Sequence, residues 1–77
     1  MEMNVIGTRG ISFTSEIGKP IEGTTLYAAF EAEGVNGMMA EKFFVKKGVE
    51  MPEDLKMGDK IEVVFDYRRK IEYIERI

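Results

Sequence analysis

The side chains of this chain that could do chemistry are mainly aromatic and basic. Phe44 stands between Lys42 and Lys46 in a stretch of alternating residues, and Arg68, Arg69 and Lys70 are consecutive. Aromatic rings stack on unpaired bases and cationic side chains contact phosphates, so this mixture is typical of proteins that bind single strands without reading their sequence. The candidate nucleic-acid-binding residues are Tyr27, Lys42, Phe44, Lys46, Arg68, Arg69 and Lys70.

Residue types used in catalysis and metal binding are scarce. The chain has no histidine and no cysteine, and hydroxyls such as Ser12 have no evident base to activate them. Glu53, Asp54 and Asp59 lack the spacing of a calcium loop, and zinc would lack its preferred ligands. We therefore expect no enzyme activity, no metal and no cofactor.

Length and composition indicate one small domain that spans residues 1–77. Of its residues, 44% are hydrophobic and 32% are charged, which is typical of a globular protein. Absence of cysteine favours a reducing compartment, and no segment approaches the ~20 apolar residues of a membrane span, so we expect a cytoplasmic protein. The net charge is -3, so any contact with nucleic acid needs a local basic patch.

Turn-forming residues divide the chain into five segments that alternate between apolar and polar positions. The turns fall at residues 16–20, 33–37, 47–59 and 68–70. The segments between them predict strands at residues 4–15, 21–30, 38–46, 61–67 and 71–77, and residues 49–55 have room for at most one helical turn. Five short strands bury their inner faces best by coiling into one antiparallel barrel, which is OB-fold-like or SH3-like. The OB-fold-like barrel is the favoured prediction, closed by bends at Gly7 and Gly10.

Strand parity predicts which side chains face the core. Tyr27 and Phe44 fall on the opposite face, where a binding platform would have to lie. Ile71 and Tyr73 face the core only if the loop at residues 68–70 has an odd number of residues. The other predicted core residues are Leu26, Ala28, Phe30, Met39, Phe43, Val45, Ile61, Val63, Phe65 and Tyr67.

Several motifs resemble known small proteins. The chain resembles the gene-V-type single-stranded DNA-binding proteins of filamentous phages in Gly18-Lys19-Pro20, the Leu26-Tyr27 pair, the helix-free third connection and the closing strands. Three further motifs are similar to short uncharacterised proteins of phages and mobile elements of Gram-positive bacteria. These motifs are Val5-Ile6-Gly7-Thr8, Ile11-Ser12-Phe13 and Gly23-Thr24-Thr25-Leu26-Tyr27.

The phage resemblance implies an OB-fold homodimer that coats single-stranded DNA without sequence specificity, with Tyr27 as a stacking residue. Because the turn at residues 16–20 is short, we expect no protruding wing at the first hairpin. Two functions remain open: a single-stranded DNA-binding or accessory protein of a phage or mobile element, and a protein-interaction or oligomerisation module. In the second, Tyr27 and Phe44 would contact another chain and the lysines would protect strand edges.

Overall fold

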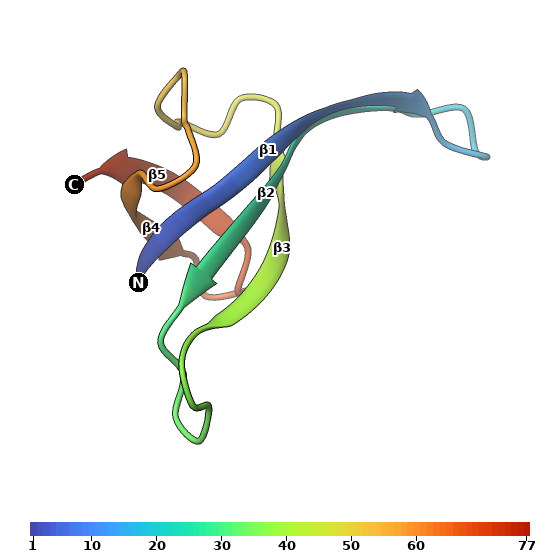
Figure 1. Ribbon diagram of the computed structural model, residues 1–77. Coiled ribbons are helices and arrows are strands. Elements are labelled where there is room, and N and C mark those ends of the chain that lie inside the picture. The colour runs from blue at the N-terminus through green and yellow to red at the C-terminus, as the bar shows by residue number, and fades with distance from the viewer.

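The computed structural model describes residues 1–77 and contains five antiparallel strands and no helix (Figure 1). Their order across one sheet is β3-β2-β1-β4-β5. The all-β, five-stranded prediction is confirmed, and no helical turn forms between β3 and β4. The strands are β1 (Glu2–Thr14), β2 (Pro20–Phe30), β3 (Met39–Lys46), β4 (Lys60–Phe65) and β5 (Ile71–Arg76).

A bulge in β1 decides which of its side chains face the core. Val5 lies opposite Ala28, whereas Gly7 lies opposite Tyr27, so Ile6 is an extra residue with no partner. An extra residue reverses the parity of the residues that follow it. Val5 therefore faces the core, while later odd-numbered residues of β1 face the other side of the sheet.

One small apolar cluster, with residues from all five strands, forms the core. Leu26, Ala28 and Phe30 are buried as predicted, and Phe43 and Phe65 pack against the cluster from its margin. The cluster consists of Met3, Val5, Leu26, Ala28, Phe30, Val45, Ile61, Val63, Ile71 and Ile74.

Two predicted core residues, Met39 and Tyr67, are exposed, and Phe43, Phe65 and Tyr73 are only half-buried. Met39 is 41% exposed because β3 begins there, at the edge of the sheet. Tyr67 is 88% exposed because β4 ends at Phe65 and Tyr67 lies in the following turn. On β5, the pairing passes from Val64 with Tyr73 to Phe65 with Ile71 and leaves Glu72 as an extra residue. This irregularity turns Ile74 inward in place of Tyr73.

The sheet does not close into a barrel. Its edge strands β3 and β5 form no pair with each other. The outer edge of β5 contacts the chain after β3 instead, because the Ile74 amide donates to the Glu50 carbonyl at 2.9 Å. The closed OB-fold-like barrel expected from the sequence is therefore not confirmed by the strand pairing.

The first hairpin protrudes, contrary to the expectation from its short turn. Pairing of β2 with β3 ends at Gly23, whereas pairing of β1 with β2 continues to Thr14 and Pro20. Figure 1 shows this two-stranded arm reaching away from the other strands, and the molecule measures 42 × 26 × 21 Å. The strands, rather than the turn, supply the length of the arm.

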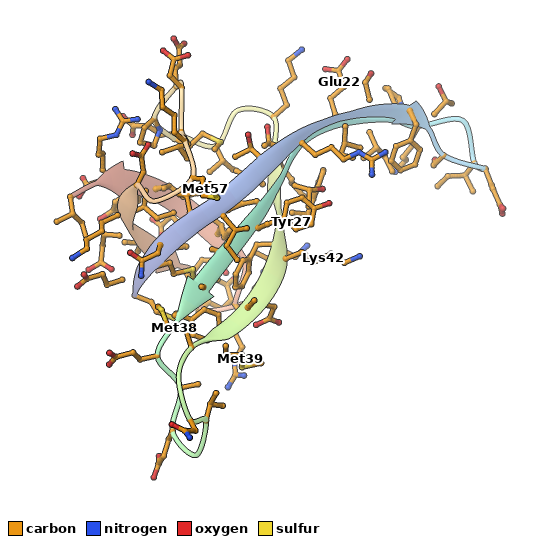
Figure 2. All side chains as sticks on the ribbon, in the orientation of Figure 1. Glu22, Tyr27, Met38, Met39, Lys42 and Met57 are labelled. Carbon is orange, nitrogen blue, oxygen red and sulfur yellow. The ribbon has the colours of Figure 1, made fainter.

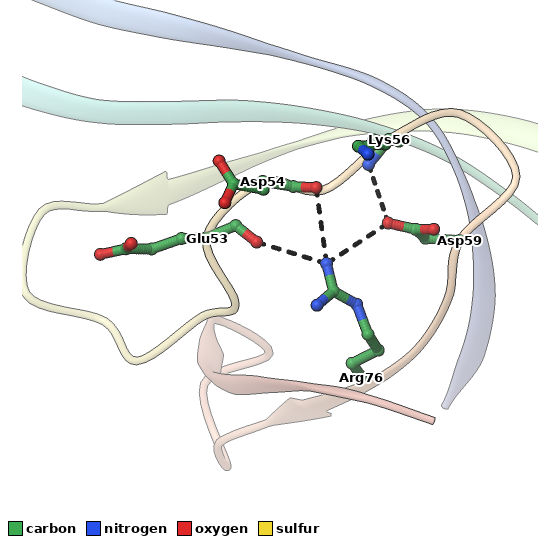
Figure 3. A network of polar contacts seen from close by, with 5 residues as sticks. All are labelled: Glu53, Asp54, Lys56, Asp59 and Arg76. Carbon is green, nitrogen blue, oxygen red and sulfur yellow. Dashed lines mark hydrogen bonds and ion pairs between the residues drawn. The ribbon is translucent and has the colours of Figure 1, made fainter.

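A polar network holds the loop between β3 and β4 (Figure 3). Arg76 on β5 donates to the carbonyl oxygens of Glu53 and Asp54 at 3.3 and 3.5 Å, and to the Asp59 carboxylate at 3.4 Å. Asp59 also accepts from the Lys56 amide at 2.9 Å. One guanidinium therefore ties a loop without regular structure to the last strand.

We expect Arg76→Ala to lower the free energy of unfolding by about 0.5–1.5 kcal/mol, the usual net contribution of such exposed hydrogen bonds. Urea unfolding measures the loss, and faster amide exchange at Lys56 would locate it in the loop. Glu75→Ala on the same strand is the control, since Glu75 makes no side-chain hydrogen bond or ion pair. Equal losses in both variants would contradict a role for the network.

Candidate nucleic-acid interface

Three strands place aromatic, basic and small side chains in rows on the side of the sheet opposite the core. Residues directly opposite each other in a ladder share a face. We call this surface the outer face. Its rows are Ile11-Gly23-Lys46, Arg9-Thr25-Phe44 and Gly7-Tyr27-Lys42, each read from β1 through β2 to β3. Figure 2 shows Tyr27 and Lys42 on the adjacent strands β2 and β3.

The Phe44 ring lies over Gly23. A Cβ atom added at Gly23 would come within 2.7 Å of Phe44 Cζ and 2.9 Å of Cε1, and it would also meet the Val45 carbonyl oxygen. Only a residue without a side chain leaves room for the ring to lie so close to β2. The ring is thereby held against the sheet while 43% of the residue stays exposed.

Tyr27 borders a neighbouring hollow of the same surface, about 460 Å³ in volume. Lys42, Phe44 and Arg9 also line it. Arg9 is a candidate residue that the sequence reasoning missed, because the bulge before it reverses the parity of β1. A regular strand through residue 6 would have turned Arg9 toward the core.

A second hollow lies between β3 and the hairpin that joins β4 to β5, and we call it the seam. Its volume is about 340 Å³. Phe43, Phe65 and Ile71 line it at the margin of the core, and Phe44 lies beside them. Its charged lining residues are Lys42, Lys46, Arg69 and Lys70.

The structure thus brings six of the seven predicted site residues to two adjoining hollows, and Arg68 is the exception. Its guanidinium lies 5.3 Å from the centre of the Tyr67 ring, and its Nε donates to the Tyr67 hydroxyl at 3.2 Å. It does not line the seam. Arg68 therefore lies on the same turn as Arg69 but has a different environment.

The cations of the seam have no acidic partner. No acidic residue lines it, and none of its four cations forms an ion pair. The nearby Lys47 differs, since Glu22 lies 2.8 Å from its ammonium and raises its pKa through a hydrogen bond and charge attraction. In a chain of net charge -3, the seam is a local concentration of uncompensated positive charge.

The turn that carries Arg69 has a strained backbone. The Asp66 amide donates to the Lys70 carbonyl and the Arg69 amide to the Asp66 carbonyl, which defines a three-residue hairpin loop. The first hairpin has the same pattern, with Gly18 at φ 81° where this one has Arg69 at φ 63°. A left-handed conformation costs a residue with a side chain roughly 1–2 kcal/mol, so Arg69 is retained at some cost in stability.

We expect Arg69→Gly to raise the free energy of unfolding by about 0.5–1 kcal/mol, since glycine adopts this conformation freely but also gains freedom in the unfolded chain. Thermal unfolding measures the change. Arg68→Gly is the matched control and should be neutral or destabilising, because residue 68 has no left-handed backbone. A lower melting temperature for Arg69→Gly would contradict strain at this position.

No group of three or more acidic, histidine or cysteine side chains converges as a metal site would require, and the structure offers no candidate membrane-spanning helix. No protein-family model matches the chain, and neither the curated proteins nor the solved structures compared with it contain a match. Function can therefore be inferred only from the residues of the outer face and the seam.

Proposed function

We propose that this chain is a non-catalytic, sequence-nonspecific single-stranded DNA-binding or accessory protein that holds its ligand across the outer face and the seam. The observation that carries the proposal is the adjacency of two aromatic rings, Phe44 exposed and Tyr27 half-buried, and of cations without ion-pair partners. Arg9, Tyr27, Lys42 and Phe44 share one hollow, and the seam adds Lys46, Arg69 and Lys70. Stacking rings combined with cations along a groove is how proteins bind single strands without reading sequence.

The fold that we propose for this function is an open OB-type barrel. In support, β1 pairs with both β2 and β4, so the sheet has its two halves joined through one long bent strand. The OB-fold is a partly open five-stranded barrel that binds oligonucleotides on strands two and three and on the loops after strands one and four. The outer face, which includes β2 and β3, and the turn between β4 and β5 that carries Arg69 support this proposal.

Fluorescence anisotropy of a labelled oligo-dT of about twelve nucleotides, titrated over a range of salt concentrations, tests the proposal. Each neutralised phosphate contributes about 0.7 to the slope of log affinity against log salt for single strands. Arg9, Lys42, Lys46, Arg69 and Lys70 together therefore predict a slope of at most about 3.5 in magnitude. A duplex of the same length should bind more weakly, because its bases are not free to stack. Absence of binding at low salt would contradict the proposal.

A protein-interaction or oligomerisation module is the second candidate, favoured by apolar side chains along the arm. Phe13 and Ile17 are exposed there, and Ile21 lies opposite Phe13. Exposed aromatic residues are enriched at interfaces between proteins. Light scattering after size exclusion tests this candidate: a dimer that Phe13→Ser converts to a monomer would support it, and a monomeric wild type at high concentration would contradict it.

A further inference from the structure

We infer that the seam is a one-nucleotide site, in which one unpaired base lies on an apolar floor while its flanking phosphates contact a cationic rim. This inference rests on the proposed function. To the proposed function it adds where in the interface one base binds, and that this base must be unstacked from its neighbours in the strand.

The floor of the seam is a part of the core margin that the sheet leaves uncovered. The Phe43 and Phe65 rings lie 6.0 Å apart between centroids and are tilted by 56°. No ladder joins β3 to β5, and both rings line the seam that lies between β3 and the last hairpin. A flat apolar ligand that covers them removes apolar surface from water, which is favourable.

The rim supplies charge of one sign only. Lys42 and Lys46 come from β3, and Arg69 and Lys70 come from the turn between β4 and β5. Like charges gathered around one hollow repel one another, and an anionic ligand relieves that repulsion. The rim has cations on both sides of the floor, as a base flanked by two phosphates requires.

The size of the seam fits one base with its sugar. A cavity of about 150 Å³ accommodates a benzene ring, whereas the seam measures about 340 Å³. A base inside a duplex cannot reach the floor without leaving its pair and its stack, which is energetically unfavourable. The seam therefore selects for single strands.

An acidic peptide with an apolar side chain is the competing ligand. The seam shares Lys42, Phe43 and Phe44 with the hollow that contains Tyr27 and Arg9. A ligand that crosses both hollows must present flat groups and negative charges repeatedly along its length. Single-stranded nucleic acid has this repeat in every nucleotide, so the continuity of the two hollows favours it.

A photocrosslinking experiment with the full chain tests where a base lies. Oligo-dT that carries a single 5-iodouracil is bound at low salt and irradiated, and mass spectrometry of the digested protein locates the crosslink. We expect a crosslink at Phe65 in addition to crosslinks at Phe43, Phe44 or Tyr27, and absence of the Phe65 crosslink would overturn the inference. Phe65 is the informative position, because it lines the seam and not the hollow around Tyr27. Crosslinks confined to residues of the hollow around Tyr27, namely Tyr27, Phe43 and Phe44, would show that no base reaches the floor of the seam.

The variants Arg69→Gly and Arg68→Gly test the rim with equal losses of charge on one turn. Arg69 lines the seam and Arg68 does not. We expect Arg69→Gly to reduce the salt slope of oligo-dT binding by about 0.7, and Arg68→Gly to leave it unchanged. Because Arg69→Gly is expected to stabilise the fold, its weaker binding would not reflect unfolding.

The outcomes separate this inference from the proposed function. If oligo-dT binds with the predicted salt dependence but the two glycine variants behave alike, the inference is overturned and the proposed function stands. If a polyglutamate peptide of the same charge competes better than oligo-dT, the seam is a peptide site and the inference is overturned. If no oligonucleotide binds at low salt, both fail.

Discussion

Replacing Gly23 with alanine is expected to lower the free energy of unfolding by about 1–3 kcal/mol, the usual cost of forcing a methyl group into a filled site. The new Cβ atom would meet the Phe44 ring at 2.7 Å and also the carbonyl oxygen of Val45. The ring can rotate away, but the carbonyl belongs to the β3 backbone and can move only by disturbing the ladder. Urea unfolding measures the loss of stability.

The same substitution should also weaken oligo-dT binding, because the displaced Phe44 ring no longer lies against the sheet. Gly10→Ala is the matched control. It lies on neighbouring β1, and a Cβ atom there would meet nothing within 4 Å. We expect the control to change stability by less than about 0.5 kcal/mol, as for most surface substitutions. If Gly23→Ala changed stability and binding no more than Gly10→Ala, this would contradict the claim that the Phe44 ring packs against Gly23.

Replacing Tyr27 or Phe44 with alanine is expected to weaken oligo-dT binding by about 5- to 150-fold, which corresponds to the ~1–3 kcal/mol that each stacked base contributes. Both rings lie on the outer face in neighbouring rows, so one strand can pass over both. The loss should persist at high salt, since stacking involves no counterion release. Anisotropy titrations at two salt concentrations measure it.

Tyr67→Ala is the control for these stacking variants. Tyr67 is the most exposed aromatic residue of the chain, but it lies in the turn after β4 and lines neither the hollow around Tyr27 nor the seam. We expect its loss to leave the affinity within about twofold of the wild type, as for residues outside a binding surface. If Tyr67→Ala weakened binding as much as Phe44→Ala, any exposed ring would serve, and the outer face would have no special role.

The alternation of residue types was sufficient to predict the five strands and the faces of β2 and β3. Both strands are regular in the region of the outer face. Parity therefore placed Tyr27 and Phe44 on one face of the sheet and Leu26 and Val45 on the other, as the structure does. The residues of β2 and β3 in the interface could therefore be found from the sequence.

Parity failed where a strand contains an extra residue. The bulge at Ile6 places Arg9 on the outer face, where parity did not predict it. The irregularity at Glu72 places Ile74 in the core instead of Tyr73. Bulges depend on how a strand must bend to meet its neighbours, and two nearby glycines indicated the bend in β1 without locating it. The seam was also missed, because sequence patterns do not show which edge strands remain unpaired.

The central claim is that a single strand of DNA lies across the outer face and the seam. Its most direct test is backbone amide NMR of the full chain titrated with oligo-dT. We predict shifts that progress with added ligand at Arg9, Tyr27, Phe44 and Arg69, and unchanged signals in the loop that Arg76 holds. Shifts confined to that loop, or no shifts at low salt, would contradict the claim.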